Sequence, residues 1–171
     1  MGAVHVRIAE PADAAAMAAI YNVGIEGRQA TFETESRSAR DFEERIVGAT
    51  HPMLVAQLCG RVVGCAWISP YSDRASYAGI GECSAYVAAD ARGRGIGTAL
   101  CEALADEAER RGFHKLLGKL FTTNVASIRL VRRCGFQGVG LHQCHGRLDG
   151  EWRDVLLVER LLGEAAKACG D

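Results

Sequence analysis

A glycine-rich turn is the segment that points most directly to chemistry: Gly93-Arg94-Gly95-Ile96-Gly97-Thr98. It joins an apolar run that ends at Val87 to a long helical pattern. A turn that opens a helix leaves backbone N–H groups unpaired at the positive end of the helix dipole, and glycines let a phosphate approach them. Arg92 and Arg94 could add charge-assisted hydrogen bonds. The segment predicts a pyrophosphate cradle, the alternative being a tight turn with two solvated arginines.

Spacing excludes two common nucleotide-binding motifs at this turn. The order G-x-x-x-x-G-K-[ST] is absent, so no lysine is placed to reach the terminal phosphates of a nucleoside triphosphate. The glycines form G-x-G-x-G rather than G-x-G-x-x-G, and about 20 residues on, where an acid would bind a ribose, stand Leu116 and Leu117. We therefore expect neither a P-loop nor a dinucleotide-binding fold.

Glu82 is the carboxylate whose position suggests acid–base chemistry. It stands in an apolar strand pattern, where a carboxylate is costly without a purpose. Strand alternation places it on the same face as Ser84 and Tyr86. Such a group could take the proton of an amine nucleophile, directly or through water. The alternatives are an edge carboxylate or a core salt bridge to Arg74.

Two motifs together resemble one superfamily. Arg92-x-x-Gly95-x-Gly97 resembles the acetyl-coenzyme A signature of the GCN5-related N-acetyltransferase (GNAT) superfamily, and Asn124-x-x-Ser127-x-x-Leu130-x-x-x-x-Gly135-Phe136 looks like its second cofactor segment. The resemblance implies an acetyl-CoA-dependent N-acetyltransferase with Glu82 as its catalytic base. It implies cosubstrate contacts at Ala85, Tyr86, Val87, Arg92, Gly93, Arg94, Gly95, Ile96, Gly97, Thr98, Asn124 and Ser127. Asn124 could instead simply cap the helix that follows it.

A narrower likeness involves four further segments. They resemble the phosphinothricin and arsinothricin acetyltransferase group and read Ala30-Thr31-Phe32-Glu33, Tyr71-x-x-Arg74-x-x-Tyr77, Glu82 before Tyr86-Val87, and Gly150-x-Trp152-x-Asp154-Val155. The likeness implies acetylation of the α-amine of such amino-acid analogues, which detoxifies them, with methionine sulfone or sulfoximine as the alternative acceptor. It also implies a homodimer. We expect Phe32, Arg74 and Tyr77 to bind the substrate, with Arg74 on an anionic group.

One position departs from the resembled group. Val131 stands where a His is frequent in the group and where a Tyr elsewhere in the superfamily protonates the leaving thiolate. Water or the substrate's own proton must then serve, while an N–H near Tyr86 or Val87 stabilises the oxyanion. Because of this departure, a non-catalytic acyl-CoA-binding module is an alternative interpretation. Acetylation of a protein amine is a further alternative, which would favour an acidic or open peptide groove.

Hydrophobic periodicity predicts an α+β protein of the GNAT type, with a mixed, mainly antiparallel central sheet flanked by about four helices. The expected strands are Val4–Ala9, Met53–Leu58, Arg61–Ile68, Gly79–Ala88, Lys115–Phe121, Phe136–His142 and Trp152–Leu161. The expected helices cover 11–22, 38–48, 95–111 and 125–134. We expect one N-acetyltransferase domain over residues 1–163 and a C-terminal tail over 164–171. Trp152 should fill the core, and Asp154 should act as a turn acceptor.

Composition narrows the possible partners. The 171 residues are 49% apolar and carry a net charge of −1, which fits one domain and gives no reason to expect nucleic acid or an anionic membrane as partner. No apolar run reaches the roughly 20 residues of a membrane span, and no signal peptide is evident, so we expect a cytoplasmic protein.

The seven cysteines form an odd number without a C-x-x-C pair, which indicates reduced thiols. The densest cluster of metal-ligand types is His142, Cys144 and His145, but strand alternation would send His145 to the opposite face from the other two. We therefore expect no metal.

Overall fold

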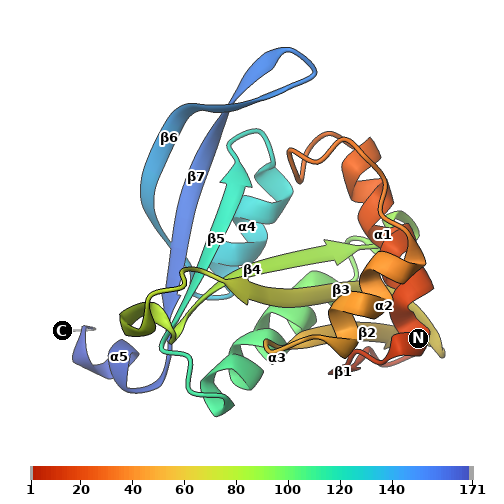
Figure 1. Ribbon diagram of the computed structural model, residues 1–171, viewed down its shortest axis with the longest axis horizontal. Coiled ribbons are helices and arrows are strands. Elements are labelled where there is room, and N and C mark those ends of the chain that lie inside the picture. The colour runs from red at the N-terminus through yellow and green to blue at the C-terminus, as the bar shows by residue number, and fades with distance from the viewer. Residues whose placement is uncertain (1, 170–171) are drawn as a thin grey trace.

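Seven strands form one sheet in the computed structural model, which describes residues 2–169 (Figure 1). Their order is β1-β2-β3-β4-β5-β7-β6, and each neighbouring pair is antiparallel except β4 and β5. The strands are β1 (His5–Ile8), β2 (Met53–Leu58), β3 (Arg61–Pro70), β4 (Ile80–Val87), β5 (Lys115–Phe121), β6 (Gln137–Leu148) and β7 (Glu151–Leu161). The predicted α+β, mainly antiparallel architecture is confirmed.

Helices cover both faces of the first half of the sheet (Figure 1). On one face lie α1 (Ala14–Glu26) and α2 (Ala39–Val47), and on the other lies α3 (Ile96–Arg110). Two further helices, α4 (Val125–Arg133) and α5 (Gly163–Ala168), follow β5 and β7 in the chain. Alternation in β2 explains the two layers: Val55 packs with α1 and α2, while Leu54 and Ala56 pack with α3. Helix α5 occupies most of the segment predicted as a tail, and the domain boundary at residue 163 stays a prediction.

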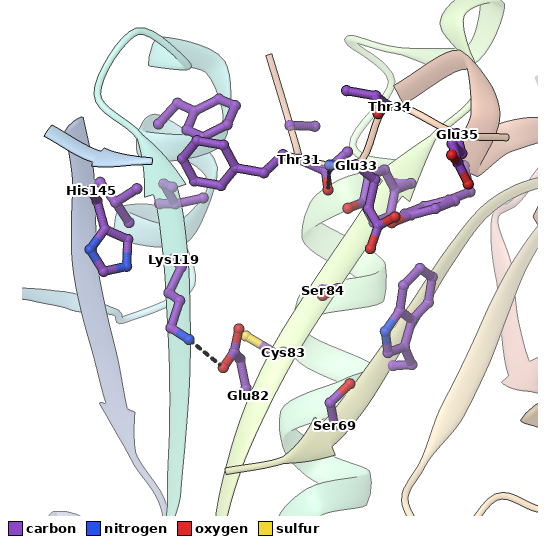
Figure 2. A pocket seen from close by; sticks show the side chains of 18 of the residues that line it. Thr31, Glu33, Thr34, Glu35, Ser69, Glu82, Cys83, Ser84, Lys119 and His145 are labelled. Atoms are coloured by element: carbon purple, nitrogen blue, oxygen red, sulfur yellow. Dashed lines mark hydrogen bonds and ion pairs between the residues drawn. The ribbon is translucent and has the colours of Figure 1, made fainter. Parts of the chain in front are cut away.

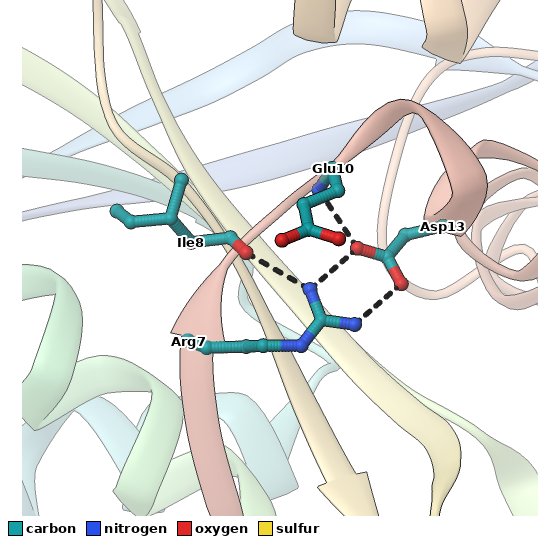
Figure 3. Close-up of polar contacts among 4 residues, drawn as sticks. All are labelled: Arg7, Ile8, Glu10 and Asp13. Carbon is teal, nitrogen blue, oxygen red and sulfur yellow. Dashed lines mark hydrogen bonds and ion pairs between the residues drawn. The ribbon is translucent and has the colours of Figure 1, made fainter.

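The start of the fold is held by one buried carboxylate (Figure 3). The Arg7 guanidinium on β1 donates to both oxygens of Asp13, at 2.7 and 2.8 Å. The backbone N–H of Glu10 donates to the same carboxylate at 2.8 Å. These contacts connect β1 to the turn that leads into α1. The charge of Asp13 is therefore fully paired and has a structural role.

The β6–β7 hairpin extends beyond the helices at the opposite end of the sheet (Figure 1). Strand β6 continues past the predicted end at His142, because a bulge between His142 and Gly146 interrupts the alternation on which that prediction rested. The expectation that Trp152 fills the core is wrong, since its side chain is 55% exposed and lies under the Arg147 guanidinium, 4.4 Å from the ring centroid. No helix among the described residues is long and apolar enough to cross a membrane.

Candidate active site

Strands β4 and β5 pair over only three residues and then part. Their parallel register ends at Glu82 opposite Leu117. Beyond that point the edge of β4 is open, and this is the strand splay that an oxyanion site near Val87 requires. Because the Ala88 N–H donates to Val63 of β3 at 2.9 Å, alternation turns the N–H of Tyr86 toward β3 as well. The N–H groups of Ala85 and Val87 therefore point into the gap, and that of Tyr86 does not.

The glycine-rich turn lies directly after this open edge. Helix α3 begins at Ile96, and its N-cap Gly95 has a φ of 79° and offers no side-chain cap to the first turn. Gly93 is also left-handed, with a φ of 74°, and there is open space beside both glycines. Uncapped N–H groups beside open space fit the pyrophosphate of acetyl-CoA.

The predicted cosubstrate residues of the turn differ in what they can offer. The side chains of Arg92 and Arg94 are exposed, and the Arg92 Nε also donates to the Val87 carbonyl at 3.3 Å. Ile96 is only 1% exposed and packs in the core, so only its backbone can reach a ligand. Gly97 lies against Leu130 of α4, where an added Cβ would come within 3.0 Å.

The second cofactor segment begins with a helix cap. Asn124 Oδ1 accepts a hydrogen bond from the Ser127 N–H at 3.1 Å, and its Nδ2 donates to the Gln29 carbonyl at 2.9 Å. Asn124 thus caps α4 and ties it to the loop after α1. Val131 on the same helix packs against the core. Its side chain has no acidic proton, so it cannot protonate a leaving group.

A pocket of about 710 Å³ opens where β4 and β5 part (Figure 2). Glu82 projects into it from β4, and Lys119 reaches toward it from β5. Lys119 Nζ lies 2.9 Å from Glu82 Oε2, so the proposed salt bridge of Glu82 to Arg74 is wrong. The Glu82 side chain is 31% exposed and therefore only partly buried. The sequence did not single out Lys119. It stands two residues after Leu117, which is level with Glu82, so alternation places Lys119 on the same face of the sheet as Glu82.

Aromatic rings form one wall of the pocket. Tyr86 stacks on Trp67 with centroids 5.4 Å apart, and it meets Tyr21 edge-on at 4.8 Å. Burial, together with the neighbouring Tyr21, raises the pKa of Tyr86, so its phenol stays protonated. Tyr86 therefore acts as packing and as a neutral wall.

A cysteine also lines the pocket beside Glu82. The Cys83 thiol donates to the Leu117 carbonyl at 3.1 Å. Burial raises the pKa of Cys83 to about 12, which keeps the group as a thiol. Because the thiolate is the nucleophilic form, Cys83 is unsuited to carry an acetyl group.

The predicted substrate residues separate in the structure. Phe32 lines the pocket and meets Phe121 edge-on at 4.7 Å. Arg74 and Tyr77 are not among the residues that line it. They lie in the exposed turn before β4, where Tyr77 contacts the Tyr71 ring at 5.9 Å.

Arg45 of α2 provides a guanidinium in the pocket that the sequence did not single out. Its side chain lies over the Trp67 ring, 4.9 Å from the centroid. It forms no ion pair with any residue that the structure describes, whereas the pocket residue Glu33 pairs with Arg37 at 2.9 Å. On an amphipathic helix this arginine looks like any other surface residue, which is why sequence reasoning passed over it.

The two histidines of β6 do not lie on opposite faces as predicted. The rings of His142 and His145 stack, with centroids 4.6 Å apart. The reason is the bulge at Cys144, whose φ of 49° breaks the alternation, and whose N–H donates to Asp154 at 2.7 Å. Asp154 therefore accepts the bond that shapes this bulge. Within residues 2–169 no three His, Cys, Asp or Glu side chains gather as metal ligands.

Comparisons with known proteins agree with this geometry. Residues 17–136 match the acetyltransferase (GNAT) family. The chain is 33% identical to an L-methionine sulfoximine/L-methionine sulfone acetyltransferase of Pseudomonas aeruginosa, over 82% of this chain and 78% of that protein. It is 31% identical to a phosphinothricin N-acetyltransferase of Alcaligenes faecalis, over 94% of this chain and 83% of that protein.

A solved structure extends the likeness to three dimensions. The crystal structure of a GNAT superfamily phosphinothricin acetyltransferase from Sinorhizobium meliloti, in complex with AcCoA, superimposes with a TM-score of 0.89 at 31% identity. The superposition covers 96% of this chain and 91% of that one. A match that spans most of the chain, on a sheet whose strands part beside a glycine cradle, shows that this chain belongs to the acetyltransferase (GNAT) family.

Proposed function

We propose that this protein transfers acetyl from acetyl-CoA to the α-amine of a small amino-acid analogue such as phosphinothricin or arsinothricin, and so detoxifies it. As a family member it is an acetyl-CoA-dependent N-acetyltransferase. The observation that carries the proposal is the position of Glu82, a carboxylate that faces a pocket of about 710 Å³ at the point where β4 and β5 part.

The proposed chemistry assigns one task to each part of this opening. Glu82 takes the proton of the substrate ammonium, directly or through water, which leaves a neutral amine nucleophile. The Val87 N–H, which points into the gap, stabilises the oxyanion. The cradle at Gly93 to Thr98 holds the pyrophosphate, with Asn124 and Ser127 beside the pantetheine arm. A proton from water or from the substrate completes thiol release.

Arg45 supports an acceptor that carries a negative group. A guanidinium without an ion pair can bind a carboxylate, phosphinate or arsenic oxyanion through paired hydrogen bonds. Arg74 and Tyr77, named by the family likeness, remain proposed contacts. Steady-state kinetics separate the two arginines: we expect Arg45→Met to raise KM for phosphinothricin about tenfold or more, and Arg74→Ala to have the smaller effect. KM for acetyl-CoA should change in neither variant.

Methionine sulfone or sulfoximine is the second candidate acceptor, favoured by the relative from Pseudomonas aeruginosa. These compounds share the α-carboxylate of phosphinothricin but lack its acidic side-chain group. Arg45→Met should therefore leave their KM nearly unchanged if Arg45 binds the side-chain anion, and raise it as much as for phosphinothricin if Arg45 binds the α-carboxylate. Release of free thiol from acetyl-CoA, measured with phosphinothricin, arsinothricin, both methionine analogues and a peptide amine, ranks the acceptors. A preference for the peptide would refute the proposal, and the absence of turnover together with tight acetyl-CoA binding would favour a non-catalytic module.

A homodimer and a cytoplasmic location belong to the same proposal. The dimer is supported by the apolar side chains that β6 and β7 leave exposed, among them Val139, Leu141 and Trp152. The location is supported by the seven free cysteines, which suit a reducing compartment. Light scattering during gel filtration should give twice the chain mass, and Leu141→Ser together with Trp152→Ser should reduce it to a monomer if this hairpin is the interface.

A further inference from the structure

An amine of the protein already occupies the place that the substrate amine needs. Lys119 Nζ lies 2.9 Å from Glu82 Oε2, inside the pocket (Figure 2). A substrate ammonium that gives its proton to Glu82 must come within the same hydrogen-bonding distance. The two amines therefore compete for one carboxylate, and both are primary amines with the same acylation chemistry.

The position of Lys119 along β5 brings it toward the expected oxyanion site. Glu82 is level with Leu117, the last residue of β5 that pairs with β4, and Lys119 follows two residues later, where the strands part. At about 3.3 Å per residue, Lys119 starts further along the opening than the base, in the direction of the Val87 N–H. Its flexible four-carbon side chain can extend either back to Glu82 or forward along the pocket.

We infer that Lys119 is an acetyl acceptor of its own enzyme when no amine substrate fills the pocket. This inference rests on the proposed function, because it uses the same base and the same acetyl donor. The Lys119 ammonium gives a proton to Glu82, and the neutral Nζ attacks the thioester carbonyl carbon. A C–N bond forms, the attacking nitrogen loses its second proton to water, and the C–S bond breaks with its electron pair on sulfur. The proton taken by Glu82 then yields the free thiol, so one proton in total is released to solvent.

The product changes the pocket in a defined way. Acetylation converts the ammonium of Lys119 into a neutral amide and removes its ion pair with Glu82. An amine substrate that occupies the Glu82 carboxylate excludes Nζ from it, so saturating substrate should protect Lys119. Acetylation of Lys119 is thus expected when acetyl-CoA is abundant and the amine is scarce.

Three lysines in the whole chain make the test simple: Lys115, Lys119 and Lys167. The purified protein is incubated with acetyl-CoA alone, and each lysine is followed by peptide mass spectrometry. Lys115 is a matched control, since it also pairs with a glutamate, Glu159 at 2.8 Å, but does not line the pocket. Lys167 is exposed on α5 and reports direct chemical acetylation. We expect Lys119 to be acetylated faster than both.

Two variants separate catalysis from simple reactivity. Glu82→Gln should slow acetylation of Lys119 by about 100-fold while leaving Lys167 unchanged, because only Lys119 uses the base. Lys119→Arg keeps a cation beside Glu82 but is not an acetyl acceptor, so the substrate-free release of thiol should disappear. Thermal melting of both variants verifies that they fold.

Acetylation of Lys119 at the rate of Lys167, or at an unchanged rate in Glu82→Gln, would overturn the inference. The same result together with normal acetylation of phosphinothricin would leave the proposed function intact. Absence of acetyl transfer to every amine, Lys119 included, would refute both.

Discussion

Two ion pairs of this molecule each join a basic side chain to a carboxylate, but they differ in burial and in the number of contacts. At the start of the fold, Arg7 and Asp13 have side chains 26% and 7% exposed, and Asp13 also accepts the Glu10 N–H. At the opening between β4 and β5, Lys119 and Glu82 are 48% and 31% exposed and share a single contact.

The two pairs differ in burial and in the number of hydrogen-bond partners, and these two properties decide whether a carboxylate can exchange its partner. Asp13 is held by three hydrogen bonds and cannot exchange its partner without loss of structure. Glu82 has one flexible partner and open pocket beside it, so a substrate amine can replace Lys119. The first pair belongs to the fold, and the second is the one that the proposed function assigns to the reaction.

The largest effect should come from removing the charge of Glu82. We expect Glu82→Gln to lower kcat/KM about 1000-fold at neutral pH, because the substrate ammonium then lacks a proton acceptor. The loss should shrink at alkaline pH, where more of the amine is already neutral. Calorimetry should show unchanged affinity for acetyl-CoA. A loss of equal size at every pH would mean that Glu82 is structural, as Asp13 is.

Removing the charge of Asp13 should affect stability rather than catalysis. We expect Asp13→Asn to cost about 3 kcal/mol in the free energy of unfolding, since Arg7 is left partly buried without its partner. Urea denaturation measures this cost, and turnover per folded molecule should stay normal at a temperature where the variant is folded. A selective loss of turnover would remove the distinction between the two pairs.

The same pair predicts a pH dependence of stability. Burial acts to raise the pKa of Asp13, but the hydrogen bonds from Arg7 and the Glu10 N–H outweigh it, so the pKa lies below its ordinary value. A lowered folded-state pKa stabilises the fold above the unfolded value of about 3.9, and this contribution is lost as pH falls through the folded-state value. The stability gap between wild type and Asp13→Asn should therefore narrow below about pH 4.

The glycine cradle should show a smaller effect, on binding. Gly95→Ala places a Cβ at a φ of 79°, which costs about 1 kcal/mol, and obstructs the approach of phosphate to the N–H groups of α3. We expect acetyl-CoA affinity to fall about tenfold by calorimetry. Gly60→Ala is the matched control, since Gly60 has a φ of 77° and open space but lies in the β2–β3 turn. Equal affinity in both variants would contradict the cradle.

The smallest effect should be that of Lys119 on stability. Because this pair is partly exposed, Lys119→Met should change the free energy of unfolding by less than about 1 kcal/mol. Urea denaturation beside Asp13→Asn gives the direct contrast. A cost as large as that of Asp13→Asn would make the Lys119–Glu82 pair part of the fold and remove its freedom to exchange.

Local signals were sufficient for most elements of the fold. The helix expected over 38–48 begins with a local signal, Ser38 followed three residues later by Asp41, and both bonds of this capping box are present at α2. The expected strands Met53–Leu58 and Arg61–Ile68 leave only Cys59 and Gly60 between them, which is the length of a tight hairpin turn, and both residues have positive φ. The glycine-rich start of α3 was also predictable, because the helix start and its glycines are consecutive in the chain.

The sequence alone determined the family motifs, the mainly antiparallel sheet and the choice of Glu82 as the candidate base, since each depends on residues within one element or on one alternation. Only the tertiary structure decided which residues meet: Lys119 at Glu82, Arg45 in the pocket, and Arg74 outside it. Local periodicity does not predict where β4 and β5 part, nor the β-bulge at Cys144. The partners in the pocket follow from strand register and divergence, and those are set by packing between segments far apart in the chain.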